Sequence, residues 1–418
     1  MVYVINKEGQ ALMPTERFGK VRRLLKNGLA HVVCRIPFTI QLDYETTNFV
    51  QPISLGVDAG SKHIGISATT KEKELYAADV ELRNDIVDKL STRREQRRAR
   101  RNRLRYRKAR FNNRISSKRK GWLVPSIENK IQTHLTVIEK IHKFLPITNI
   151  VVETASFDIQ KIKNPSISSE GYQQGEQLGF FNVREYVLFR DKHTCQHCKG
   201  KSKDNVLNVH HIESRKTGGN APNNLITLCE TCHKKYHKGE IQLKLKRGKS
   251  FRDAAFMGIM RWAFYNRLKS IYKNVSMTFG YITKNTRILN NLPKEHYVDA
   301  RCISGNPNAK PLGYYFYQKK VRCQNRQIHK ANFLKGGKRR LNQAPFLMKG
   351  YRLFDLVKYQ NDLYYIFGRR SNGFFDIRKL DGAKINKGSI SCKRIRFVDI
   401  RRSILTERRN SCSIPPTN

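Results

Sequence analysis

Four cysteines arranged as two Cys-x-x-Cys pairs are the first residues in this chain whose spacing predicts a specific chemistry. Cys195 and Cys198 form one pair, and Cys229 and Cys232 form the other. Two such pairs are typical of a structural Zn²⁺ ion held by four thiolates. We therefore predict a closed zinc site here rather than four unrelated cysteines.

Histidines between and behind the cysteine pairs predict a second metal site. His210 ends an expected strand from 206 to 211, while His233 and His237 are four residues apart and so share one face of a short helix. We expect His210 and His233, with His237 as a third ligand, to hold one divalent ion. An ion held there would stabilise the leaving 3′ oxygen of a phosphodiester.

His211, the next residue of the same strand, faces away from this ion and is suited to take a proton from water. We expect Asn224 to orient His211 through a side-chain hydrogen bond. The alternative is a zinc-binding domain with extra surface histidines. A four-cysteine site already satisfies zinc, however, and would leave these histidines without a role.

Three acids far apart in the sequence predict a further metal site. Asp58 follows an apolar run from 53 to 57, Glu153 lies inside the apolar run 147–157, and Asp299 lies one helical turn after His296. A carboxylate in an apolar strand is costly to bury without a partner or a metal ion. The intervening pattern of strand, hairpin, strand, helix and strand would bring Asp58 and Glu153 onto adjacent strands. We expect a two-metal carboxylate cluster with Mg²⁺ or Mn²⁺, which fits phosphoryl-transfer chemistry.

The charge of the chain points to nucleic acid as its partner. Its 82 Lys and Arg against 33 Asp and Glu give a formal net charge of +49, and a polyanion would neutralise it. The run from 93 to 120 holds 15 basic residues and one acid and predicts a long helix that contacts nucleic acid. We expect the contacts from Arg94, Arg97, Arg98, Arg100, Arg101 and Arg105.

The remaining pattern predicts an α/β protein of several domains. The N-terminus reads as a small α/β cap with strands at 2–5 and 31–42 and a helix at 17–26, followed by an antiparallel meander over 53–82. Helices are expected at 126–145, 251–272 and 295–304, and a strand at 275–282. The C-terminal part alternates in strand fashion over 351–359, 363–370, 373–380 and 395–400, which predicts a small basic β-barrel or sheet.

Cysteine usage predicts the compartment. The nine cysteines do not form a disulfide framework, the N-terminus has no signal-peptide pattern, and no stretch approaches a membrane span. We expect an intracellular protein of a prokaryotic cytoplasm or nucleoid, or of an organelle, and no membrane partner.

The residues Cys195–His237, with VHHI, GG, NNLITLC and CHxxxH in order, resemble the HNH endonucleases. That resemblance implies a ββα-metal domain in which His211 is the general base, Asn224 orients it, and His210 and His233 bind the metal. LGVDAGSKHIGIS, VVETASFD and HYVDA resemble the three pieces of a split RuvC nuclease of RNase H fold. They imply that Asp58, Glu153, His296 and Asp299 are its metal-site residues.

A RuvC core interrupted by an HNH module and carrying RRARR at 97–101 is similar to the transposon-encoded IscB family, relatives of the CRISPR type II effectors. ALMP at 11–14 resembles the PLMP tetrad of that family, with its first proline replaced. The resemblance implies a monomeric ribonucleoprotein in which a guide RNA pairs with one DNA strand. The HNH site would cut that paired strand and the RuvC site would cut the displaced one.

The implied domains are a cap at 1–50, RuvC pieces at 51–90, 122–160 and 251–305, an arginine-rich bridge helix at 91–121, an HNH module with linkers at 161–250, and a β-rich domain at 306–418 that would bind a target-adjacent motif or RNA. Two alternatives stay open. One is a guide-independent HNH nuclease of homing or restriction type, and the other is a nuclease-dead RNA-binding protein.

Overall fold

The computed structural model describes residues 1–104, 122–154, 176–214, 219–242, 248, 252–323 and 345–411. The chain divides into two compact units, one made of Met1–Ala155 with Ile259–Asn418 and the other of Ser156–Gly258. Each unit is a mixture of helices and strands, so the expectation of an α/β protein with several domains is confirmed. No helix among the described residues is long and apolar enough to cross a membrane.

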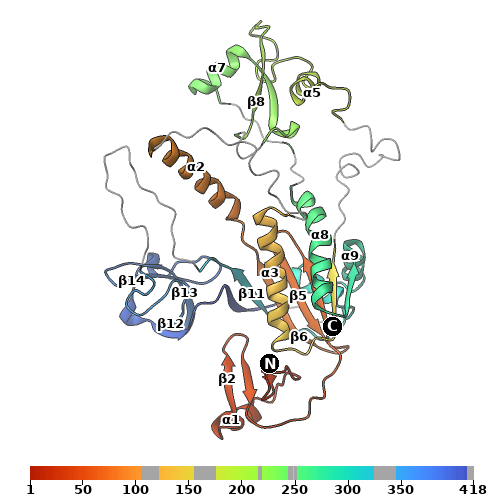
Figure 1. Cartoon of the computed structure of the whole chain (residues 1–418), viewed down its shortest axis with the longest axis vertical. Helices are drawn as coiled ribbons and strands as arrows, with labels where there is room; N and C mark the ends of the chain where they lie inside the picture. The colour runs from red at the N-terminus through yellow and green to blue at the C-terminus, as the bar shows by residue number, and fades with distance from the viewer. Residues whose placement is uncertain are drawn as a thin grey trace. The chain divides into compact units, whose positions relative to one another are not determined.

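The first unit begins with the N-terminal cap, a three-stranded sheet with one helix (Figure 1). The sheet has the order β1-β3-β2, and its elements are β1 (Tyr3–Ile5), α1 (Phe18–Lys26), β2 (Ala30–Cys34) and β3 (Thr39–Leu42). Val4, Val21 and Ile40 meet in its small apolar core. The strand β1 and the helix α1 were predicted from the sequence, whereas the single strand expected over 31–42 is two strands, β2 and β3, separated by a turn at 35–38.

The centre of the first unit is a seven-stranded sheet of order β10-β7-β4-β5-β6-β11-β17. Three antiparallel strands form the predicted meander: β4 (Ser54–Ala59), β5 (His63–Thr69) and β6 (Glu74–Glu81). On one side, β7 (Asn149–Glu153) pairs in parallel with β4, and β10 (Val275–Thr278) pairs in parallel with β7. On the other side, β11 (Tyr314–Lys320) joins β6 and β17 (Ile404–Asn410).

The edge formed by β11 and β17 differs from the expected domain boundary at 305. Both strands come from the part of the chain expected to form a separate β-rich domain, but they extend the central sheet. Side-chain contacts of Tyr317 on β11 help to hold these strands together. Its hydroxyl group donates a 2.6 Å hydrogen bond to Glu81 of β6, and the guanidinium group of Arg409 of β17 lies 3.7 Å from the centroid of its ring.

Helices cover the sheet. Figure 1 shows α3 (Pro125–His142) running alongside α8 (Arg252–Ile271), and the Arg267–Glu128 ion pair and the ring contact of His134 with Phe264 join them. The expected strand at 275–282 is correct only as far as Thr278, because α9 (Gly280–Leu289) starts there and is followed by α10 (His296–Ile303). The arginine-rich helix α2 (Ile86–Leu104) starts earlier than expected, and its predicted continuation to 120 lies outside the described residues.

The rest of the C-terminal part forms a second sheet of order β15-β14-β13-β12-β16. Its strands are β12 (Leu356–Tyr359), β13 (Asp362–Arg369), β14 (Phe374–Arg378), β15 (Ile390–Ser391) and β16 (Arg396–Asp399). Val357, Ile366 and Phe375 are fully buried in its own core. The predicted small β-domain therefore exists, with a smaller share of the chain than expected.

The second unit is small. It contains α5 (Val183–Arg190), the hairpin of β8 (Leu207–His211) and β9 (Leu225–Cys229), and α7 (Glu230–Lys238). Asp191, at the end of α5, accepts a 2.8 Å hydrogen bond from the backbone N–H of Thr227 and so fixes α5 to β9.

Candidate nuclease sites

The carboxylate site lies where β4 and β7 end side by side. The two strands are parallel and in register, and Asp58 pairs with Glu153. Residues in register on neighbouring strands point to the same face of the sheet. The prediction that these two acids lie on adjacent strands is therefore confirmed.

Helix α10 is pressed onto the same face. Gly56 and Gly65 make this possible, because a Cβ atom on either one would lie 1.9 Å from a backbone oxygen of α10, that of Ala300 or of His296. Without side chains at these two positions the helix approaches the strands closely enough to bring its first turn to Asp58. The ring of His296 then meets Asp58, with 2.8 Å between Nδ1 and Oδ2.

Burial and mutual repulsion characterise these acids. The pKa of Glu153 is raised to about 7, mainly by burial and in smaller part by the negative charges of Asp58 and Asp299. Burial also raises the pKa of Asp299. The hydrogen bond to Asp58 raises the pKa of His296. A divalent cation would relieve this repulsion, so the donor set fits such an ion.

The three acids do not form one tight cluster. Among the described residues, only the four cysteines and three of the histidines form groups whose ligand atoms all lie within 4.8 Å of one another. Asp299 instead forms an ion pair with Arg287 of α9, at 2.9 Å between Oδ1 and Nε. Arg287 was missed in the sequence, where it is one cation among many.

A second missed residue is His63, at the start of β5. Its ring stacks on that of His296, with 5.2 Å between the centroids and an angle of 5° between the planes. On its other side, Nδ1 of His63 lies 2.9 Å from Oδ1 of Asp79. Its place five residues after Asp58, across a predicted tight turn, is the signal in the sequence that could have identified it.

The four cysteines of the second unit are gathered as predicted. Their sulfur atoms lie within 4.8 Å of one another, and three of the four residues are buried. Ser202 lies 3.2 Å from Sγ of Cys198, and this hydrogen bond lowers the pKa of the Cys198 thiol to about 6. Burial raises the pKa of Cys232. Four thiol ligands at this spacing fit Zn²⁺, which would favour their thiolate forms.

The histidine site lies beside them because α7 begins directly after Cys229 and carries both Cys232 and His233. The ring nitrogens of His210, His233 and His237 lie within 4.8 Å of one another. Burial lowers the pKa of His210 to about 4, and the neighbouring His233, His237 and His211 add to that effect. Three imidazole groups whose ring nitrogens lie this close together fit a divalent ion.

The expected hydrogen bond between Asn224 and His211 is wrong. Nε2 of His211 instead lies 3.0 Å from Oδ1 of Asn220. The fully buried Asn224 instead hydrogen-bonds to the loop that connects β8 and β9. Its amide group donates to the backbone oxygens of Glu213 and Gly219 and accepts from the N–H of Glu213. Asn224 thus fixes the loop that presents Asn220, and the pattern could not identify which of the neighbouring asparagines reaches the ring.

The arginines predicted to contact nucleic acid lie on α2 as far as the structure describes them. Arg94, Arg97 and Arg98 are exposed on this helix. Arg100 and Arg101 belong to the same helix, and Arg105 lies outside the described residues.

Comparisons with known proteins agree with parts of this picture. The family model of the RRXRR protein matches residues 2–175, and that of the HNH endonuclease matches residues 195–239. Anaredoxin of Nostoc sp. (strain PCC 7120 / SAG 25.82 / UTEX 2576) is 46% identical over 41 residues, which are 10% of this chain and 54% of that protein. The chain thus spans about half the length of this curated relative.

Among solved structures, Streptococcus thermophilus Cas9 in complex with the AGAA PAM is 14% identical with a TM-score of 0.32, over 50% of this chain and 30% of that one. The same protein in complex with the AGGA PAM is 13% identical with a TM-score of 0.33, over the same shares. A similarity this low carries no argument on fold or function. The two family matches support a nuclease with an HNH endonuclease domain.

Proposed function

We propose that this protein is an RNA-guided DNA endonuclease of the IscB kind, which makes a double-strand cut with two separate nuclease sites. One observation carries the proposal: a single chain holds a carboxylate site built on paired strands and, in a different compact unit, a histidine site with its own structural cysteines. One site for each strand is the simplest use of two complete sets of hydrolytic residues.

The strand order supports an RNase H-like, RuvC-type core for the first site. Three antiparallel strands, β4 to β6, continue on the far side of β4 into the parallel strands β7 and β10. In this proposal Asp58, Glu153 and Asp299 hold Mg²⁺ or Mn²⁺. His296 orients Asp58 through its Nδ1 hydrogen bond, and Asp299 must first leave Arg287. The bound ions would supply charge stabilisation for the attacking and leaving oxygens.

In the HNH site, His211 acts as the general base. Its Nε2–H donates to the side-chain oxygen of Asn220, and this bond selects the tautomer in which Nδ1 is free to take the proton of water. His210, His233 and His237 hold one Mg²⁺ or Mn²⁺ ion, which would stabilise the leaving 3′ oxygen. Asn224 is a positioning residue that acts through the loop of Asn220.

The positive charge of the chain supports a guide RNA as its partner. A net charge of +49 and the exposed arginines of α2 suit a polyanion held along its backbone. Guide RNA paired with one strand of double-stranded DNA would leave the HNH site to cut that strand and the RuvC-type site to cut the displaced one. The separate C-terminal sheet would then read a short flanking motif or contact the RNA.

A guide-independent HNH nuclease is the second candidate. It is favoured by the completeness of the unit Ser156–Gly258, which contains the base, all three histidine ligands and the cysteine cluster. A nuclease-dead RNA-binding protein is disfavoured, since the proposed catalytic residues are present at both sites.

The test is to purify the full chain, sequence the RNA that accompanies it, and assay cleavage of a matching DNA before and after the RNA is digested. We expect cutting to be lost with the RNA and restored by adding it back. Cutting that continues unchanged after complete RNA removal would establish the guide-independent nuclease instead.

A further inference from the structure

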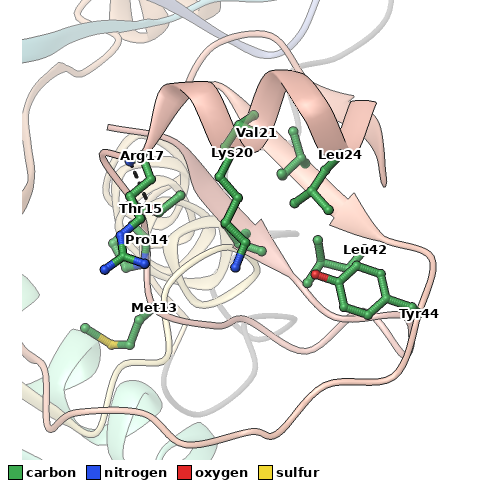
Figure 2. Close-up of a pocket in the computed structure, with 11 residues that line it drawn as sticks. Met13, Pro14, Thr15, Arg17, Lys20, Val21, Leu24, Leu42 and Tyr44 are labelled. Carbon is green, nitrogen blue, oxygen red and sulfur yellow. Dashed lines mark hydrogen bonds between the residues drawn. The ribbon is translucent and has the colours of Figure 1, made fainter. Parts of the chain in front are cut away.

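The N-terminal cap contains a cavity of about 290 Å³ that neither nuclease site uses (Figure 2). Its floor is the apolar core of the cap, where Val4, Val21, Ile40 and Leu42 are all buried. Four segments enclose it: the strands β1 and β3, the helix α1, and the turn before that helix. An apolar cavity of this size, at the low end of ligand pockets, suits one flat group and is too small for a folded element.

Two basic side chains, Arg17 and Lys20, lie at the edge of this cavity. Figure 2 shows the side chains of Arg17 and Lys20 extending in the same direction on one side, with the ring of Tyr44 opposite them. Both cations are exposed, and within the described part of the chain neither side chain forms an ion pair. The ligand that suits the cavity therefore has a flat, largely apolar part and an anion attached to it.

We propose that this cavity binds one unstacked nucleobase of the bound RNA, with its phosphate between Arg17 and Lys20. A nucleotide combines the required ring and charge, and proteins commonly recognise RNA through bases turned out of the stack. The inference rests on the proposed function, since it takes the guide RNA as the ligand. It adds a site on that RNA away from the arginine-rich helix.

Charge also argues against two basic segments of the chain as the occupant. The stretches 105–121 and 324–344 contain many Lys and Arg and no acidic residue. Either one would bring like charges against Arg17 and Lys20, whereas an RNA phosphate would neutralise them.

The experiment uses the full chain with its co-purified RNA. Ultraviolet cross-linking and peptide mapping should locate a nucleotide on the peptides of Met13 and Tyr44, both of which line the cavity. The double variant Arg17→Ala/Lys20→Ala should lower the cross-link yield about fivefold or more, because it removes both charges that hold the phosphate. Leu24→Trp, which fills the cavity, should do the same.

Arg22→Ala/Arg23→Ala is the matched control. It removes the same amount of charge from the same part of the cap at two exposed residues that do not line the cavity, so the cross-link should remain. Equal loss in both double variants would mean general attraction of RNA and would overturn the proposal. Thermal unfolding of each variant shows whether the cap is still folded.

Oxidation of Met13 provides a second measurement and separates the possible occupants. We expect bound RNA to slow this oxidation and RNase treatment to restore it. Protection that persists after RNase treatment would place a protein segment in the cavity and overturn the proposal. If RNA accompanies the protein but neither readout responds, only this inference fails; if no RNA accompanies it at all, the proposed function fails as well.

Discussion

The raised pKa of Glu153 predicts how the stability of the folded protein depends on pH. An ordinary glutamate ionises at 4.5, whereas burial raises the pKa of Glu153 to about 7 in the folded protein. Between these values the folded state holds a proton that the unfolded chain has lost. Ionising Glu153 therefore costs the fold nothing well below 4.5, and the full cost is present above 7.

The magnitude follows from the two pKa values. The cost is about 0.8 kcal/mol near pH 5 and about 3.3 kcal/mol near pH 8, since one pKa unit corresponds to about 1.4 kcal/mol. Glu153→Gln has no charge to bury at any pH. Its stability relative to the natural protein should thus increase by about 2.5 kcal/mol between these conditions, or about 5 °C in Tm for a unit of this size.

Tryptophan fluorescence during heating, in metal-free buffer, is the appropriate assay. The chain has two tryptophans, Trp122 and Trp262, and both belong to the unit that contains Glu153. Glu139→Gln is the control, because it removes an exposed carboxylate from α3. A divalent ion added near pH 8 should stabilise the natural protein and have much less effect on Glu153→Gln. A difference in Tm that does not change with pH would refute the argument from burial.

Three further predictions concern the independence of the sites. Asp58→Ala and His211→Ala should each leave a nicking enzyme, on opposite strands; strand-resolved gels in which either variant loses both cuts would contradict this. A chelator that removes zinc from the four cysteines should unfold the second unit, which would then be cleaved by protease. The tryptophan fluorescence of the first unit should not change. A single transition that is the same with and without zinc would argue against it. His63→Ala should lower kcat for the displaced strand about tenfold with KM little changed, whereas His63→Phe, which can still stack on His296, should recover most of it; equal losses would reduce His63 to a packing residue.

The sequence predicted those features that follow from local pattern. The meander of β4 to β6, the helices α1, α3, α8 and α10, and the cysteine and histidine groups depend on residues close together in the chain. The pairing of Asp58 with Glu153 was also within reach, because a strand that follows a meander and one helix has few places to join the sheet.

What the sequence did not predict depends on contacts between distant segments. β17 pairs with β11 across roughly ninety residues, and an alternating strand carries no sign of which edge it will join. Helix α9 was read as the end of a strand because its apolar residues continue the pattern of β10. The stacking of His63 on His296 requires α10 to lie against Gly65, a tertiary contact that neither segment reveals alone.

The two sites should respond unequally to acid, which yields a last prediction. A pH near 6 lies below the Glu153 pKa of about 7, so this carboxyl group is mostly protonated and protons compete with metal ions at the carboxylate site. His210, with a pKa of about 4, stays neutral there and can still bind its ion. Lowering the pH from about 8 to about 6 should therefore slow cutting of the displaced strand more than that of the paired strand, and nicked DNA should accumulate. Strand-resolved rates that fall in parallel would show that burial of Glu153 does not control metal binding.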